Sequence, residues 1–111
     1  MMSFDAVIRL VGDVGDEELR RWIAERWVLP ESGAAGYVFH EVDVARVQLI
    51  HELRYDLAID EEAMPVVLRL LDQVYALRRR LRLLHDAIEA QPEELRQGLL
   101  AQLGPLLSDD R

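Results

Sequence analysis

An apolar residue recurs at alternating intervals of four and three positions through the second half of the chain. This spacing places every apolar side chain on one stripe of a helix, as at the a and d positions of a coiled coil. We predict a helix from about Asp60 to Gln91, which at ~1.5 Å per residue would be roughly 45–50 Å long. A stripe of that length needs a partner helix. We call it the seam, and it comprises Ala63, Val67, Leu70, Val74, Leu77, Leu81, Leu84 and Ile88.

The first half of the chain predicts shorter elements. Residues 4–11 are expected to form a short helix that ends at the Gly-containing turn of residues 12–15. A second helix begins near Asp16, whose acidic first turn suits a helix amino terminus, and it stops by Pro30. Its tryptophans, Trp22 and Trp27, are assigned to the core. These two helices and their tight turn form a helix-turn-helix unit.

A small hairpin and a third helix are expected to follow. Two β-prone runs, residues 28–30 and 37–39, flank a loop rich in glycine and serine, which predicts a hairpin. Placed after a helix-turn-helix unit, such a hairpin is a wing. The third helix is predicted over residues 41–55, because its apolar residues form a wide face.

The seam helix has recognisable end signals. Asp60 is its predicted N-cap, and Pro65, in the second turn, is expected to bend the start of the helix. A last short helix is predicted over residues 93–103, ended by Gly104–Pro105. The predicted fold class is therefore mainly α, with a winged helix-turn-helix unit, a long coiled-coil-type helix and a short carboxyl-terminal helix.

We divide the chain into residues 1–56, the winged unit with the third helix, and residues 57–111, the part used for docking or dimerisation. The seam has two interpretations. It pairs with a second copy, or it folds back onto the last helix, or both arrangements hold, with the start of the helix packed on the third helix and the remainder dimerising. We favour a homodimer, because no apolar segment within the 111 residues matches the full length of the seam. The residues available for folding back are Leu95, Leu99 and Leu103.

Composition narrows the class of protein. The chain contains no cysteine, which removes disulfides, thiolate metal sites and cysteine nucleophiles. No apolar run is long enough to span a membrane, and the amino terminus lacks the pattern of a signal peptide. We expect a cytoplasmic protein that has no membrane segment.

The charge is acidic throughout. The formal net charge is −8, and residues 1–45 hold nine acidic and four basic side chains. Residues 46–91 hold eight and seven, and residues 92–111 hold four and two. Binding to DNA depends on neutralising phosphates with Lys and Arg, so this balance argues against tight non-specific binding to nucleic acid. It suits a basic protein partner better.

No pattern in the sequence indicates catalysis, cofactor binding or metal binding. The three histidines, His40, His51 and His85, are dispersed, and no glycine-rich phosphate loop is present. Acidic residues cluster at helix starts, where the helix dipole explains them. We expect no catalytic residue, no cofactor and no metal site, so the protein is not expected to be an enzyme.

Several stretches together resemble a known family. The order of helix-turn-helix, wing, third helix and long helix resembles the MerR superfamily of winged-helix proteins. Within it, the chain looks like the chaperone-modulator branch, the CbpM-like proteins. The stretches that carry the resemblance are Leu19-Arg20-Arg21-Trp22, Val28-Leu29-Pro30, Tyr37-Val38-Phe39, and residues 51–60 and 66–74.

The resemblance implies a function. A protein of that branch binds the J-domain of a DnaJ-like co-chaperone and blocks its stimulation of the Hsp70 ATPase. Charge complementarity with a basic docking helix of the J-domain suggests acidic contact residues near the third and fourth helices. These candidates are Glu52, Asp56, Asp60, Glu61 and Glu62.

The alternative is a DNA-binding regulator of the MerR type that acts as a homodimer. Its DNA contacts would be Arg20 and Arg21, in the place of the recognition helix. However, the i,i+4 spacing of Glu17 and Arg21 is typical of a solvated helix face. The wing loop has no basic residue. We therefore expect a protein partner rather than DNA.

Overall fold

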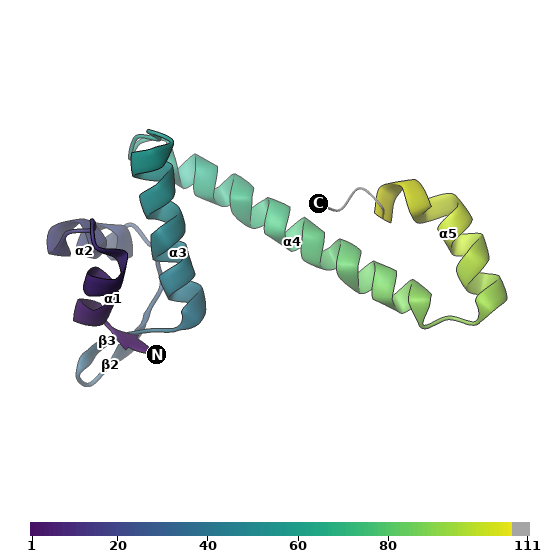
Figure 1. The fold of residues 1–111 in the computed structure, drawn as a ribbon, viewed down its shortest axis with the longest axis horizontal. Coiled ribbons are helices and arrows are strands. Elements are labelled where there is room, and N and C mark those ends of the chain that lie inside the picture. Colours follow the sequence, from purple (N-terminus) through teal and green to yellow (C-terminus); the bar gives the residue numbers. More distant parts are fainter. Residues whose placement is uncertain (108–111) are drawn as a thin grey trace. The chain divides into compact units, whose positions relative to one another are not determined.

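The computed structural model describes residues 1–107. It is mainly helical, with one small sheet and a long fourth helix, as Figure 1 shows, and the predicted fold class is confirmed. Residues 1–68 form one compact unit, and the described chain from Arg69 onward belongs to a second. The elements are β1 (Met2–Ser3), α1 (Phe4–Val11), α2 (Asp16–Ala24), β2 (Glu31–Gly33), β3 (Gly36–Phe39), α3 (Glu41–His51), the π-helical turn η1 (Glu52–Asp56), α4 (Met64–Glu89) and α5 (Glu93–Leu107).

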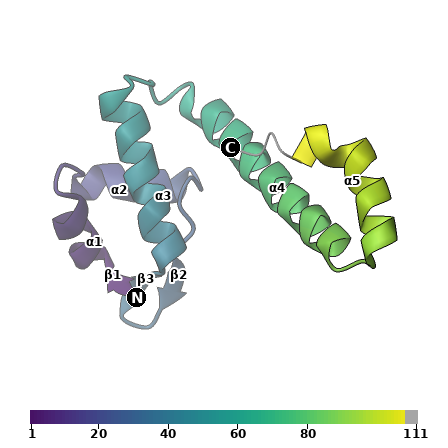
Figure 2. The same ribbon diagram turned by 45° about the vertical axis from the view of Figure 1, so that its right-hand side comes forward.

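The amino-terminal unit has one apolar core. Helices α1, α2 and α3 gather beside the sheet, as Figures 1 and 2 show. Trp22 is fully buried and Trp27 nearly so, which confirms that both tryptophans belong to the core. Met64 and Leu68, in the first turns of α4, are buried as well, so the unit extends beyond residue 56. The largest fully buried side chains are Trp22, Phe39, Leu19, Ile50, Met64, Val7, Val28 and Val47.

The sheet has three antiparallel strands in the order β1-β3-β2. Strands β2 and β3 form the predicted hairpin, and Gly36 at its turn has a φ of 113°, which favours glycine. The first strand of the hairpin was expected at residues 28–30, which is wrong. Pro30 has no N–H to donate to a ladder and Val28 is in the core, so pairing begins at Glu31.

Strand β1 was not predicted. It is only two residues long, and Met2 pairs with Phe39. The next residue, Ser3, is the N-cap of α1, because its Oγ accepts a hydrogen bond from the N–H of Ala6 at 3.2 Å. The rings of Phe4, Tyr37 and Phe39 have centroids 6.3–6.5 Å apart and join the start of α1 to β3.

Helix α3 passes directly into η1. Its start is fixed by Asp43, whose carboxylate accepts the N–H of His40 at 2.9 Å. The π-helical turn ends at Asp56, and two residues later Ala58 has a φ of 56° in the left-handed region. The N–H of Ile59 then donates to the carbonyl of Leu53 at 2.9 Å, which closes the end in the manner of a Schellman motif. The third helix therefore covers the predicted residues, but its last turn is π-helical.

Helix α4 begins later than predicted. Asp60 caps a turn, since its carboxylate accepts the N–H of Ala63 at 2.9 Å, and the regular helix starts at Met64. Pro65 is therefore the second residue of the regular helix, in its first turn and not in the second as expected. The 26 residues of α4 span about 39 Å, shorter than predicted.

The second unit contains the rest of α4 and α5, between which the chain reverses direction (Figure 2). Arg96 of α5 donates to Glu89 at 3.1 Å and also to Glu93, and these two hydrogen bonds raise the pKa of Arg96 above its usual range. Helix α5 was expected to end at Gly104–Pro105, but it continues to Leu107. Pro105 lies in the last turn, where it removes only one backbone hydrogen bond.

Candidate partner-binding surface

Helix α2 is in the place of the recognition helix of a winged unit. Its two predicted DNA contacts, Arg20 and Arg21, both interact with other side chains of the protein. The guanidinium of Arg20 lies over the Phe4 ring, 4.5 Å from its centroid, and its Nε is 3.8 Å from the carboxylate of Asp16. The Arg20 side chain remains 61% exposed, so these contacts orient the side chain but do not bury it. Arg20 therefore lies against α1.

Arg21 makes a two-pronged contact with Glu61. Its Nε donates to one carboxylate oxygen at 3.0 Å and a terminal nitrogen to the other at 2.5 Å. This hydrogen bonding raises the pKa of Arg21 and lowers the pKa of Glu61. The pair joins α2 to the turn that precedes α4. The expected pairing of Arg21 with Glu17 is not what the structure shows.

A second polar contact supports the same junction. The hydroxyl of Tyr55 in η1 donates to the carboxylate of Glu18 in α2, and this hydrogen bond raises the pKa of Tyr55. Arg54 lies over the Tyr55 ring, 5.4 Å from its centroid, and its charge also lowers the pKa of Glu61. The indole N–H of Trp22 is buried and has no hydrogen-bond partner among the described residues. Polar side chains thus hold α2, η1 and the start of α4 together.

The wing carries no Lys or Arg side chain that could contact a phosphate backbone. Its strand β2 carries Glu31, whose carboxylate lies 2.9 Å from Nε2 of His40. The remaining residues of the loop are serine, glycine and alanine. A wing contacts DNA through basic side chains, so this wing is poorly suited to bind DNA.

Charge is divided unevenly between the two units. Residues 1–68 hold 14 acidic and six basic side chains, whereas residues 69–111 hold seven of each. The whole net charge of −8 therefore belongs to the unit that contains the wing and the recognition helix. An excess of this kind repels a polyanion and attracts a cationic partner.

The five predicted acidic contact residues all lie in the amino-terminal unit, between the end of α3 and the start of α4. Glu52, Asp56 and Glu62 are exposed. Glu61 is held by Arg21, and Asp60 caps the turn before α4, so these two side chains also support the fold. The structure therefore separates three available carboxylates from two that already have structural partners.

A hollow of about 280 Å³ lies between α2 and the start of α4. It brings together side chains that the sequence placed in different predicted sites, since Arg21 was a DNA candidate and Glu61 and Glu62 were partner candidates. Trp27 and Pro65 supply its apolar wall. The lining residues are Arg21, Glu25, Trp27, Glu61, Glu62 and Pro65.

Half of the eight seam residues are exposed. Leu70, Val74, Leu77 and Leu84 are between 41% and 55% exposed, and Val67 and Leu81 are half-buried. Ile88, at its carboxyl-terminal end, is only 4% exposed. Of the residues available for folding back, Leu95 is 51% exposed, and Leu99 and Leu103 are half-buried. Folding back thus leaves the middle of the seam uncovered.

Residues 1–107 provide neither a metal-binding cluster nor a helix suited to cross a membrane. Within that range no group of three or more His, Asp or Glu side chains is placed to hold a metal ion. No helix of the described chain is long and apolar enough to cross a membrane.

Sequence reasoning missed the contacts that join distant parts of the chain. Glu18 and Tyr55 are 37 residues apart, and Arg21 and Glu61 are 40 apart. Helical spacing provides signals for pairs three or four residues apart and none for pairs such as these. The strand that contains Met2 was also missed, although the next residue, Ser3, is a favoured N-cap residue and marked the start of α1.

Comparison with known proteins gives one result. A family model described as MerR HTH family regulatory protein matches residues 7–86. No curated protein and no solved structure matched the chain. The matched range covers well over half of the sequence and includes most of α1, all of α2, the wing, α3 and most of α4. This chain therefore belongs to the MerR HTH family of regulatory proteins.

Proposed function

We propose that this protein is a chaperone modulator of the CbpM-like kind. It binds the J-domain of a DnaJ-like co-chaperone and thereby prevents the co-chaperone from stimulating the Hsp70 ATPase. The partner in this proposal is a protein with a basic docking helix, and the surface that receives it belongs to the amino-terminal unit.

The observation that carries the proposal is the state of the recognition helix. Arg21 is engaged by Glu61, and Arg20 lies against Phe4 and Asp16. A MerR HTH unit in which Arg21 is held by a carboxylate and whose net charge is −8 is a weak match for DNA and a good match for a cationic protein surface.

The direct test is a calorimetric titration of the full chain with the isolated J-domain of the DnaJ-like co-chaperone from the same organism. We expect saturable binding that weakens as salt is added, because complementary charge contributes to the encounter. The absence of heat and of any complex at high micromolar concentration would contradict the proposal.

The structure sharpens the choice of variants. Reversing Asp60 or Glu61 would disturb the fold as well as the surface, so the informative variant reverses only Glu52, Asp56 and Glu62. We expect this triple variant to bind the J-domain at least about 10-fold more weakly.

A matched control changes the charge of the same unit by the same amount elsewhere. Asp5, Asp13 and Glu17 are exposed and lie away from the end of α3, and reversing them should alter affinity by less than about 3-fold. Equal losses in the two triple variants would show that only the total charge matters.

We also propose that the protein is a homodimer that pairs through the seam. The exposed apolar side chains of α4 form a continuous helical stripe that α5 leaves uncovered. Helices with such a stripe pair in coiled coils, where the apolar residues of one helix pack between those of the other. The modulator would then present two J-domain surfaces per dimer.

DNA binding is the second candidate, and the family match favours it. The test is a low-salt gel-shift series with the wild-type protein and Glu61→Gln, which removes a negative charge and releases Arg21. If the protein regulates transcription, the wild type retains DNA and the variant retains it more strongly. If neither retains any genomic fragment, DNA is not the partner.

A further inference from the structure

One face of α3 is exposed and has no partner within the amino-terminal unit. Glu41, Ala45, Gln48 and Glu52 follow one another at intervals of four, three and four residues, which places them on one side of a helix. All four are exposed, whereas Val47 and Ile50 on the opposite side are fully buried. We call these four residues the α3 face.

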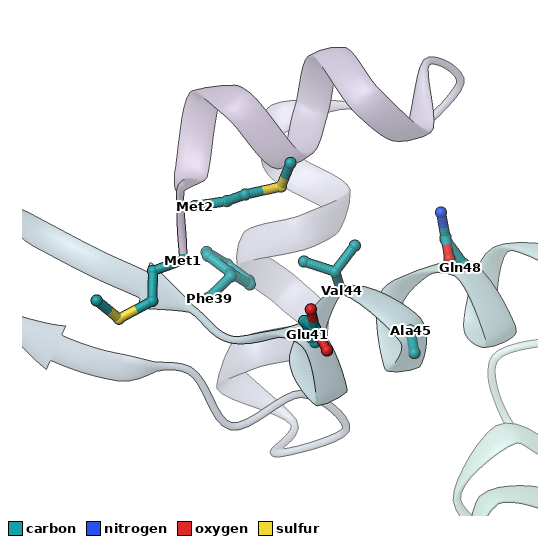
Figure 3. Close-up of a pocket in the computed structure, with 7 residues that line it drawn as sticks. All are labelled: Met1, Met2, Phe39, Glu41, Val44, Ala45 and Gln48. Carbon is teal, nitrogen blue, oxygen red and sulfur yellow. The ribbon is translucent and has the colours of Figure 1, made fainter.

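A hollow of about 300 Å³ opens at the amino-terminal end of this face. Figure 3 shows Met1 and Met2 on one side of it, with Phe39 beneath and α3 along the other side. Methionine side chains are flexible and fill irregular gaps, so this lining can adapt to an apolar side chain inserted from outside. The lining residues are Met1, Met2, Phe39, Glu41, Val44, Ala45 and Gln48.

The α3 face combines this apolar hollow with negative charge at both ends. Glu41 lies at the rim of the hollow, and Glu52 lies 11 residues further along, which at ~1.5 Å per residue is roughly 16 Å away. The arginines of the helix point elsewhere, since Arg46 donates to the carbonyl oxygen of Trp27 at 2.9 Å and Arg54 lies over Tyr55. The face therefore has a carboxylate at each end, and Ala45 and Gln48 between them line the hollow.

We propose that the α3 face is where the protein partner docks, and that the occupant is a basic amphipathic helix. One apolar side chain of that helix enters the hollow beside Ala45, and Lys or Arg residues about three turns apart face Glu41 and Glu52. The proposal rests on the proposed function and names the surface that would receive the J-domain. The net charge of −8 on the surrounding unit supplies the complementary attraction.

The test compares two single substitutions by titration with the isolated J-domain. Ala45→Arg places a long cation in the centre of the α3 face, where it blocks the hollow and repels a basic helix. Ala24→Arg, at the exposed end of α2, makes the same change in the same unit away from the face. Both sites are exposed helical positions, and unchanged circular dichroism and tryptophan fluorescence will show that both variants are folded.

We expect Ala45→Arg to weaken J-domain binding at least about 10-fold and Ala24→Arg to change it by less than about 3-fold. The double variant Glu41→Gln/Glu52→Gln should bind more weakly and with a smaller dependence on salt. A J-domain that binds the wild type and Ala45→Arg equally would overturn the docking surface and leave the proposed function standing.

Three other results are also decisive. Equal weakening by Ala45→Arg and Ala24→Arg would show a general charge effect, which overturns the α3 face as a specific surface. A wild-type protein that binds no J-domain would overturn the proposed function and this inference with it. Loss of self-association by Ala45→Arg, with J-domain affinity unchanged, would identify a second copy of the chain as the occupant.

Discussion

The contact between Arg21 and Glu61 can be measured as a coupling energy. The perturbation is a double-mutant cycle made of Arg21→Ala, Glu61→Ala and the double variant. The cycle removes the effects that each side chain has on its own and leaves the energy of the pair. It is informative because this contact joins α2 to the start of α4 across 40 residues of sequence.

The structure sets the magnitude. The pair is bidentate, which places it among the stronger ion pairs, but the Arg21 side chain is 47% exposed and that of Glu61 is 35% exposed. Solvent therefore screens the attraction, and measured exposed pairs contribute about 0.2–1 kcal/mol. We expect a coupling of about 1 kcal/mol, at the upper end of that range.

The pH dependence provides a second check. The contact lowers the pKa of the Glu61 carboxyl in the folded protein below its ordinary value of 4.5. Its stabilisation is therefore present above that ordinary value and is lost as the pH falls through the lowered one. The coupling should be largest at neutral pH and should shrink towards zero in acid.

The assay is urea unfolding followed by tryptophan fluorescence. Both tryptophans of the chain are buried in the amino-terminal unit, so their emission reports the unfolding of that unit. A coupling below about 0.3 kcal/mol at neutral pH, where experimental error in such cycles begins, would refute the reasoning. So would a coupling that stays constant after Glu61 is protonated.

Three further substitutions have defined outcomes. Ala58→Gly should raise the free energy of unfolding by about 1 kcal/mol, because Ala58 has a φ of 56° and a Cβ is disfavoured there; an unchanged urea midpoint would contradict this. Tyr55→Phe should lower the same free energy by about 0.5–1 kcal/mol by removing the hydrogen bond to Glu18, and a more stable variant would show that this bond contributes nothing. Leu77→Glu should weaken the dimer at least about 30-fold in sedimentation, because roughly 1 kcal/mol of apolar burial is lost from each copy of this 55% exposed leucine. Leu83→Glu, off the seam, should leave the dimer intact. A monomeric wild type would contradict the seam as the dimer contact.

The helices and the wing could be predicted because their signals are local. The alternation of apolar residues marks α4, and the acidic residues after Gly15 mark the start of α2. Gly36 supplies the backbone conformation that the hairpin turn requires. Each of these signals depends on residues a few positions apart, so the sequence alone carries it.

The errors came where tertiary structure overrides local preference. The residues before Pro30 have β-prone side chains, but Val28 packs in the core and the ladder with β3 begins only at Glu31. Asp60 does cap a turn, as expected, but that turn precedes α4 instead of belonging to it. Neither outcome follows from the local sequence, because both depend on how the amino-terminal unit packs.

The candidate site was only partly predictable. Charge complementarity selected five acidic residues in one region, but it could not reveal that Arg21 would engage Glu61. Nor could it find the hollow beside α3, because Met1, Phe39 and Ala45 are brought together by the pairing of β1 with β3 and by the packing of α3. Contacts of this kind exist only in the folded unit.

The measurement that tests the central claim most directly is the J-domain-stimulated ATPase rate of Hsp70 at increasing concentrations of this protein. We predict that the stimulated rate falls to the unstimulated level as the J-domain is bound, that the basal Hsp70 rate is unchanged, and that extra J-domain restores stimulation. A stimulated rate that stays constant while the protein exceeds the J-domain many times would contradict the claim that this MerR HTH protein modulates a co-chaperone.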